Sequence, residues 1–193
     1  MSPGKKETAL PEITEQNPIL IIAGTNRPGS YCLRVANRLQ RHYRNLDVPH
    51  SLLSLQELPQ SIFLPEAYAK KPKEFLPIQQ RVLDAAGLHM VVPEYNGGFP
   101  GVLKLFIDHL KFPDSFEHKP VCFTGEANGM WGAFRPVEQI QMIFGYRNAY
   151  VFPHRVFIPR IQSQFDGDGN LSSSFDQLLH DQAMNFPGFV RKL

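Results

Sequence analysis

A chain of 193 residues with 42% hydrophobic and 20% charged residues can bury the core of one ordinary globular domain. Its 20 basic and 18 acidic residues give a formal charge of +2 without a block of one sign, which argues against nucleic acid or an acidic membrane surface as a partner. The two cysteines, Cys32 and Cys122, lack the spacing of a metal site or a disulfide scaffold and indicate a reducing compartment.

The first 17 residues are polar and charged and lack the apolar centre of a secretion signal. No apolar run in the sequence approaches the roughly 18 residues of a membrane span. We therefore expect a flexible tail at residues 1–17, a single domain at residues 18–193, and a cytoplasmic protein without a membrane partner.

Predicted strands and helices alternate along the chain. Continuous apolar runs predict strands at residues 19–23, 48–55, 88–92, 121–124 and 149–158, the last interrupted by Pro153. Apolar residues at helical spacing predict helices from residue 30 to about 43, from about 73 or 78 to 87, from 100 to 110, around 137–144 and over 172–186. Residues 56–77 form a proline-rich connection of a length usually reserved for functional loops, and it is a candidate gate to a binding site.

Strands that alternate with helices imply a parallel sheet covered by helices on both faces. We expect an α/β fold, a flavodoxin-like three-layer sandwich whose five-stranded parallel sheet has the order 2-1-3-4-5. In such sheets a ligand lies beyond the carboxyl ends of the strands, where the strand order reverses. Three loops with unusual chemistry follow predicted strands and should converge there: GTNRPGS at 24–30, PEYNGGFPG at 93–101 and GEANGMWG at 125–132.

The first of these loops suits a monophosphate. Gly24 and Gly29 have the spacing of a P-loop, but Ser30 stands where that motif requires lysine. The loop offers the hydroxyls of Thr25 and Ser30, the guanidinium of Arg27 and the free N–H groups of a helix N-terminus. In the alternative interpretation Ser30 only caps the helix and Arg27 is a solvated surface charge. Because the fingerprint G-x-G-x-x-G is missing, a mononucleotide fits better than a bound dinucleotide.

The other two loops suit a planar ring. Tyr95 and Trp131 can pack on an aromatic system, and Asn96 can bind its polar edge. Glycines allow close approach of the backbone, at Gly97, Gly98 and Gly101 on one side and at Gly125, Gly129 and Gly132 on the other. An isoalloxazine ring meets this description.

These residues resemble the NADPH-dependent FMN reductase family of flavodoxin-like proteins, which includes quinone, azo and chromate reductases. The most specific match is P-E-Y-N-x-x-x-P-G-V-L-K at residues 93–104. The first loop is similar to the family's G-S-x-R-x-x-S, and the third to its G-x-x-x-G-x-x-G; Cys32 departs from the asparagine that often ends the first motif. The resemblance implies that FMN contacts Thr25, Arg27, Ser30, Tyr31, Cys32, Pro93, Glu94, Tyr95, Asn96, Gly97, Gly125, Glu126, Ala127, Gly129 and Gly132.

The reaction that the resemblance implies is carried by the cofactor. NADPH or NADH would deliver hydride to flavin N5, and two electrons would then pass to a small acceptor: a flavin, a quinone, an azo compound or a metal oxyanion. No catalytic side chain is needed, and we expect the backbone of Glu94 to face the flavin, because a carboxylate beside a reduced anionic ring is unfavourable. The resemblance also implies a homodimer or homotetramer.

Two other functions remain open from the sequence. One is a flavodoxin-like electron carrier that is reduced by a protein partner, and the other is a relative that has lost the cofactor and acts as a binding module. We expect no metal site, although DGDGN at 166–170 begins like a calcium loop. Leu171 and Gln177 occupy the positions where that loop requires glycine and glutamate.

Overall fold

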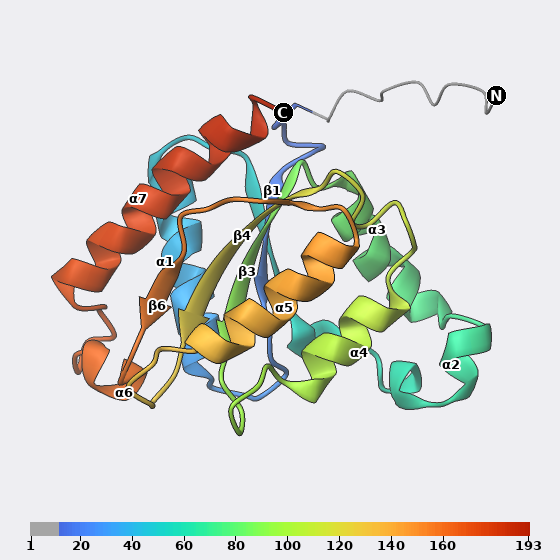
Figure 1. Ribbon diagram of the computed structural model, residues 1–193, viewed down its shortest axis with the longest axis horizontal. Helices are drawn as coiled ribbons and strands as arrows, with labels where there is room; N and C mark the ends of the chain where they lie inside the picture. Colours follow the sequence, from blue (N-terminus) through green and yellow to red (C-terminus); the bar gives the residue numbers. More distant parts are fainter. Residues whose placement is uncertain (1–11) are drawn as a thin grey trace.

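A parallel sheet between two layers of helices forms the body of the protein (Figure 1). The computed structural model describes residues 12–193, so the first 11 residues of the expected tail lie outside the described part. The strands are β1 (Ile19–Ala23), β2 (His50–Ser54), β3 (Gly87–Pro93), β4 (Pro120–Glu126), β5 (Tyr150–Val151) and β6 (Val156–Ile158). They run in the order β2-β1-β3-β4-β5, and β6 also pairs with β4. The expected flavodoxin-like order is confirmed.

Each central strand divides its side chains between two hydrophobic clusters. In β1, Ile19 and Ile21 face one cluster, whereas Leu20 and Ile22 face the other, as the two-residue period of a strand requires. The first cluster lies under α1 (Tyr31–Asn45) and α7 (Ser173–Val190). The second lies under α3 (Leu76–Asp84), α4 (Gly101–His109) and α5 (Phe134–Tyr146). Burial on both faces explains why the central strands are continuous apolar runs.

The outer strand differs from the prediction because it is two short strands. Tyr150–Val151 pairs with the start of β4, and Val156–Ile158 pairs with its end. The chain leaves the sheet at Pro153, which lies between the two strands and has no N–H group to donate. Within residues 12–193 the sheet therefore has six strands, where the sequence predicted five.

The helix before β3 ends at Asp84, earlier than the predicted end at residue 87. Ala85 is already extended, with ψ of 130°, and the N–H of Ala86 donates to the carbonyl of Pro18 at 3.1 Å. The buried ammonium of Lys119 donates to the carbonyl oxygens of Leu83 and Ala85 at 3.0 and 2.6 Å. These bonds satisfy carbonyl groups at the helix end that have no partner within the helix.

The connection predicted at residues 56–77 is more regular than expected. It consists of four short helical turns: Leu55–Glu57, Gln60–Phe63, α2 (Glu66–Ala69) and Lys73–Phe75. Ile62 and Phe75 anchor it in the cluster under α3 and α4. The turns are thus part of the packed structure.

The beginning of the described chain contacts the domain. The side chain of Ile13 packs against the cluster under α1 and α7, and the amide of Asn17 donates to the carbonyl of Asp84 at 2.8 Å. Among the helices of residues 12–193, none combines the length and the apolar character that a membrane span requires.

A buried chain of polar side chains joins α1, the sheet and α7. The Tyr43 hydroxyl lies 2.8 Å from His89 Nδ1, and His89 Nε2 lies 2.9 Å from the Thr124 hydroxyl, which donates to Gln182 Oε1 at 2.7 Å. The amide of Gln182 donates in turn to the carbonyl of Phe123 at 3.0 Å. Burial lowers the pKa of His89 to about 3. The ring is therefore neutral, and the network assigns its proton to Nε2, with Nδ1 accepting from Tyr43.

Candidate functional site

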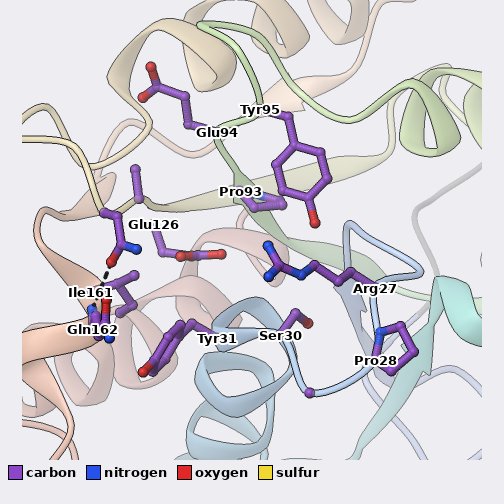
Figure 2. A pocket seen from close by; sticks show the side chains of 13 residues that line it. Arg27, Pro28, Ser30, Tyr31, Pro93, Glu94, Tyr95, Glu126, Ile161 and Gln162 are labelled. Atoms are coloured by element: carbon purple, nitrogen blue, oxygen red, sulfur yellow. Dashed lines mark hydrogen bonds between the residues drawn. The ribbon is translucent and has the colours of Figure 1, made fainter.

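A cavity of about 360 Å³ opens at the carboxyl ends of β1, β3 and β4 (Figure 2). The strand order reverses at β1 and β3, so the cavity lies where this class of sheet binds ligands. Its lining comes from four segments of the chain: Arg27, Pro28, Gly29, Ser30 and Tyr31; Pro93, Glu94 and Tyr95; Glu126, Ala127 and Asn128; and Ile161 and Gln162.

The first loop presents the N-terminus of α1 to this cavity. Ser30 caps the helix, because its Oγ accepts from the N–H of Leu33 at 3.3 Å. The hydroxyl hydrogen of Ser30 is still available to a ligand, so capping and anion binding are compatible. Figure 2 shows the guanidinium of Arg27 directed into the space between Tyr95 and Glu126. The first turn of α1 has no acidic residue, which leaves a positive site with oriented N–H groups.

Tyr95 connects the second loop to the first. Its hydroxyl is hydrogen-bonded to Thr25 Oγ1 at 2.9 Å, and the same oxygen of Thr25 accepts from the N–H of Arg27 at 3.2 Å. Thr25 is buried and does not line the cavity. It therefore holds Arg27 and Tyr95 in position from below, whereas the Tyr95 ring borders the cavity.

Asn96 and Gly97, both expected to contact a ligand, form a tight turn away from the cavity. Tyr95 and Gly98 exchange two backbone hydrogen bonds, from Tyr95 N to Gly98 O at 2.8 Å and from Gly98 N to Tyr95 O at 3.1 Å. Both central residues have positive φ, 52° at Asn96 and 79° at Gly97, as in a type I′ hairpin turn. Neither residue lines the cavity, so the Asn-Gly pair shapes the loop.

The carboxylate of Glu94 points away from the centre of the cavity in Figure 2. Its backbone N–H donates to the carbonyl of Glu126 at 3.2 Å and extends the pairing between β3 and β4. Glu94 Oε2 is buried and has no hydrogen-bond partner among the described residues. The side of this loop that faces the cavity thus consists of backbone, Pro93 and Tyr95.

Glu126 is the acidic group that reaches into the cavity. It is the last residue of β4 and is only 5% exposed. Burial raises the pKa of its carboxyl to about 7, and the nearby positive charge of Arg27 partly opposes that increase. The site therefore contains one carboxyl that changes its protonation near neutral pH.

In the third loop, Ala127 and Asn128 line the cavity, whereas the glycines pack against the backbone. A Cβ at Gly125 would lie 2.6 Å from the carbonyl oxygen of Gly132, and one at Gly132 would lie 2.8 Å from the N atom of Ile158. Gly129 accepts from the N–H of Arg160 at 3.2 Å through its carbonyl. The glycines thus allow the loop to pack closely against the backbone near β6, and they do not line the cavity. Trp131, expected to pack on a ring, is 59% exposed outside it.

The side chain of Cys32, a residue expected to contact FMN, lies in the core and not in the cavity. Tyr31 lines the cavity, but the next residue of α1 turns toward the sheet, where Cys32 is fully buried. Its thiol lies 3.3 Å from the carbonyl oxygen of Val91, to which it donates. Burial raises the pKa of this thiol well above its ordinary value. Cys32 is therefore a core residue with an inert thiol.

Asn128, Ile161 and Gln162 belong to the cavity but did not emerge from the sequence. Ile161 and Gln162 begin α6 (Ile161–Gln164), and the N–H of Gln162 donates to Asn128 Oδ1 at 3.2 Å. The N–H of Ile161 also donates to the carbonyl of Ala127 at 3.0 Å. These bonds attach α6 to the third loop. No motif of the sequence marks them, because the contact depends on the pairing of β6 with β4.

The segment at 166–170 is a turn closed by its own aspartate. Asp166 Oδ1 accepts from the N–H groups of Asp168 at 3.0 Å and Asn170 at 2.8 Å. Across the part of the chain that the structure describes, no group of three or more His, Cys, Asp or Glu side chains is arranged to hold a metal ion.

A flavodoxin-like sheet with a helix N-terminus and an arginine at its switch-point cavity defines an α/β protein suited to a mononucleotide. The model of the NADPH-dependent FMN reductase family matches residues 18–163. Because this match covers more than half of the chain, the protein belongs to that family.

One sequence relative agrees with this assignment, and solved structures of other oxidoreductases share the fold. An FMN-dependent NADPH-azoreductase of Staphylococcus aureus is 25% identical over 128 residues, which are 64% of this chain and 67% of the relative. The flavoenzyme NAD(P)H:(acceptor) oxidoreductase FerB of Paracoccus denitrificans has a similar fold, with a TM-score of 0.72, 19% identity, and coverage of 90% of this chain and 97% of that chain. An oxidoreductase of Corynebacterium diphtheriae gives a TM-score of 0.71 at 17% identity, covering 93% of this chain and 100% of the other.

Proposed function

We propose that the protein is an FMN-dependent oxidoreductase that takes reducing equivalents from NADPH or NADH and passes two electrons to a small acceptor. The observation that carries the proposal is the convergence of Arg27 and the N-terminus of α1 on one cavity beneath the ring of Tyr95. A phosphate suits the first two features and a planar ring suits the third.

The residues that line the cavity fit FMN. Arg27, Ser30 and the N–H groups at the start of α1 would hold the phosphate through charge-assisted hydrogen bonds. Pro93, Tyr95, Ala127 and Asn128 would border the isoalloxazine ring, and Thr25 would support this arrangement from beneath. Bound FMN supplies two-electron redox chemistry that no side chain of the protein can provide.

The protein's contribution is orientation and exclusion of competing groups. The Tyr95–Thr25 hydrogen bond fixes the second loop relative to the phosphate loop. The bond between Asn128 and the Gln162 backbone closes the opposite wall. The outward direction of the Glu94 carboxylate keeps that negative charge away from the ring.

We also propose that the protein is cytoplasmic, that residues 18–193 form a single domain, and that the domain assembles as a homodimer or homotetramer. Large apolar side chains that are half exposed or more support the assembly: Phe63, Leu64, Tyr68, Phe112, Met130, Trp131, Met142, Tyr146 and Met184. Size-exclusion chromatography with light scattering tests the assembly, and a monomer at micromolar concentration would contradict it.

An absorbance spectrum of the purified protein tests the proposed chemistry, with FMN added if the protein is colourless. We expect flavin bands that bleach when NADPH or NADH is added without oxygen. Bands that persist would instead support an electron carrier that is reduced by a protein partner. Failure to bind FMN would support a binding module without cofactor.

A further inference from the structure

The backbone of Glu126 is paired with neighbouring strands on both sides. In the register of the sheet it lies beside Pro93 of β3 and Ile158 of β6, and its carbonyl accepts from the N–H of Glu94. By strand alternation its side chain shares a face with Thr124, which is bonded to Gln182 of α7. The carboxyl is therefore directed toward the α1 side of the sheet and into the cavity, as Figure 2 shows.

One cation acts on this carboxyl. Across residues 12–193, no hydrogen bond or ion pair engages it, and the positive charge that influences it is that of Arg27. The titratable groups around it are Arg27 from the first loop, Tyr31 and Cys32 from α1, and Glu94 and Tyr95 from the second loop. The segment of the lining formed by Ile161 and Gln162 contributes no charged group.

Two anions can thus compete for Arg27. One is the phosphate that it is proposed to bind, and the other is the carboxylate form of Glu126. Burial disfavours this carboxylate, so that the carboxyl, with a pKa of about 7, is half protonated near neutral pH. The neutral form leaves the guanidinium to a ligand and offers an O–H donor of its own.

We propose that Glu126 makes FMN binding depend on a proton: the neutral carboxyl permits tight binding, and the carboxylate weakens it by attracting Arg27 and repelling the phosphate. This inference rests on the proposed function, because it concerns the phosphate of the proposed cofactor. By linkage, bound FMN must raise the affinity of Glu126 for its proton by the factor by which protonation raises the affinity for FMN.

The direction of the pH dependence follows from the protonation of Glu126 before FMN binds. Below neutral pH Glu126 is already protonated, so FMN binding requires no uptake of a proton. Above it, binding requires uptake of a proton and weakens, by about tenfold at alkaline pH if FMN raises the pKa of Glu126 by about one unit. The phosphate itself titrates near pH 6 and shifts affinity in the opposite direction, but equally in a protein with Glu126 replaced.

The test is a titration of FMN, followed by quenching of flavin fluorescence, at about pH 6, 7 and 8.5. The parent protein is compared with Glu126→Gln, which keeps the shape and removes the charge, and with Glu66→Gln, which alters an exposed carboxylate of α2. We expect the ratio of the parent's dissociation constant to that of Glu126→Gln to rise about tenfold over this range, and Glu66→Gln to follow the parent.

A constant ratio with measurable FMN binding would overturn the role of Glu126 and leave the proposed function intact. Absence of FMN binding by the parent at every pH would overturn the proposed function itself. A second measurement does not depend on the variant's folding: carbon-13 NMR of the Glu126 carboxyl in the parent, with and without FMN. We expect FMN to raise its pKa, and an unchanged or lowered value would contradict the inference.

Discussion

The hydroxyl of Tyr95 is hydrogen-bonded to the hydroxyl of Thr25 across the cavity's edge, at 2.9 Å. The bond joins a residue of the loop proposed to border the flavin ring to the residue that also accepts from the backbone of Arg27. It therefore connects the two halves of the candidate FMN site through protein atoms alone. Such preorganisation reduces the cost of ordering side chains on binding.

Tyr95→Phe should weaken FMN binding by about 0.5–1.5 kcal/mol, because the loops lose their hydrogen bond while the ring stays. Tyr95→Ala should weaken it further, since contact with the ring is also lost. Titration of FMN fluorescence measures both. Tyr150→Phe, at a residue that is 38% exposed on β5 beside the start of β4, is the control and should bind FMN like the parent. Equal affinities for the parent and Tyr95→Phe would argue against preorganisation.

Arg27→Ala should weaken FMN binding by about 1.5–3 kcal/mol, since a charge-assisted bond to the phosphate is lost. Riboflavin, which lacks the phosphate, should bind both proteins alike. Arg41→Ala removes an exposed positive charge from α1 and controls for net charge. If Arg27→Ala weakened riboflavin and FMN equally, the guanidinium would serve the ring or the fold, not the phosphate.

His89 should make the protein less stable in acid. Its folded pKa of about 3 lies below the ordinary value of 6.5, so the unfolded chain binds the additional proton between these values. Stability should thus fall as the pH falls from 6.5 toward 3, by up to about 1.4 kcal/mol per pH unit from this one group. His89→Gln should be less stable at pH 7, because it disrupts the network, but should lose less stability on acidification. Urea unfolding at pH 7 and at a pH between 6.5 and 3 measures the loss of stability for each protein. Equal losses for the parent and His89→Gln would contradict the lowered pKa of His89.

Asp176→Asn should destabilise the contact between α1 and α7. Asp176 accepts from Arg38 Nε at 2.5 Å and Nη2 at 2.6 Å, and lies 2.8 Å from His42 Nε2. These groups are only about one-fifth exposed, so we expect a loss of about 1–3 kcal/mol on urea unfolding. Asp181→Asn, on the same helix, is the matched control, because its side chain contacts the exposed Gln177 and should change stability by less than about 0.5 kcal/mol. Similar losses for the two variants would show that the ion pair between Asp176 and Arg38 does not stabilise the protein more than an exposed polar contact does.

Two glycines of the second loop should respond to alanine in opposite directions. Gly97→Ala should cost about 1 kcal/mol, because φ of 79° is free of strain for glycine but is disfavoured for a residue with a Cβ. Gly101 is the first residue of α4, and a Cβ added to it would meet open space. Gly101→Ala should therefore raise stability by about 0.4–1 kcal/mol. Thermal unfolding measures both, and a destabilised Gly101→Ala would reveal a contact that the structure does not show.

The order of the strands and the convergence of three loops could be predicted because both depend on local patterns. Runs such as residues 19–23 are buried on both faces, and this burial leaves a clear apolar signature. The position of Cys32 was also open to prediction. It belongs to the helical series with Val35, Leu39 and Tyr43, all of which face the core. The phosphate motif, by contrast, predicts a ligand contact at this position, so the two signals conflict.

Other parts of the site depend on contacts that local sequence does not encode. Ile161 and Gln162 reach the cavity only because β6 pairs with β4. The proximity of Arg27 to Glu126 is similarly a product of the fold, since the loop after β1 and the end of β4 meet only in three dimensions. By contrast, the Asn96–Gly97 turn carries a recognisable hairpin signal in the sequence. The resemblance to a flavin-binding loop predicts ligand contacts for the same two residues.

The division of the outer strand has a consequence for solubility. An edge strand exposes backbone donors and acceptors that can recruit a strand from another molecule and start aggregation. Here Tyr150–Val151 and Val156–Ile158 are separated by a segment that contains Pro153, so neither offers a long, straight template. The same interruption that brings α6 to the cavity thereby protects this side of the sheet from pairing with another chain.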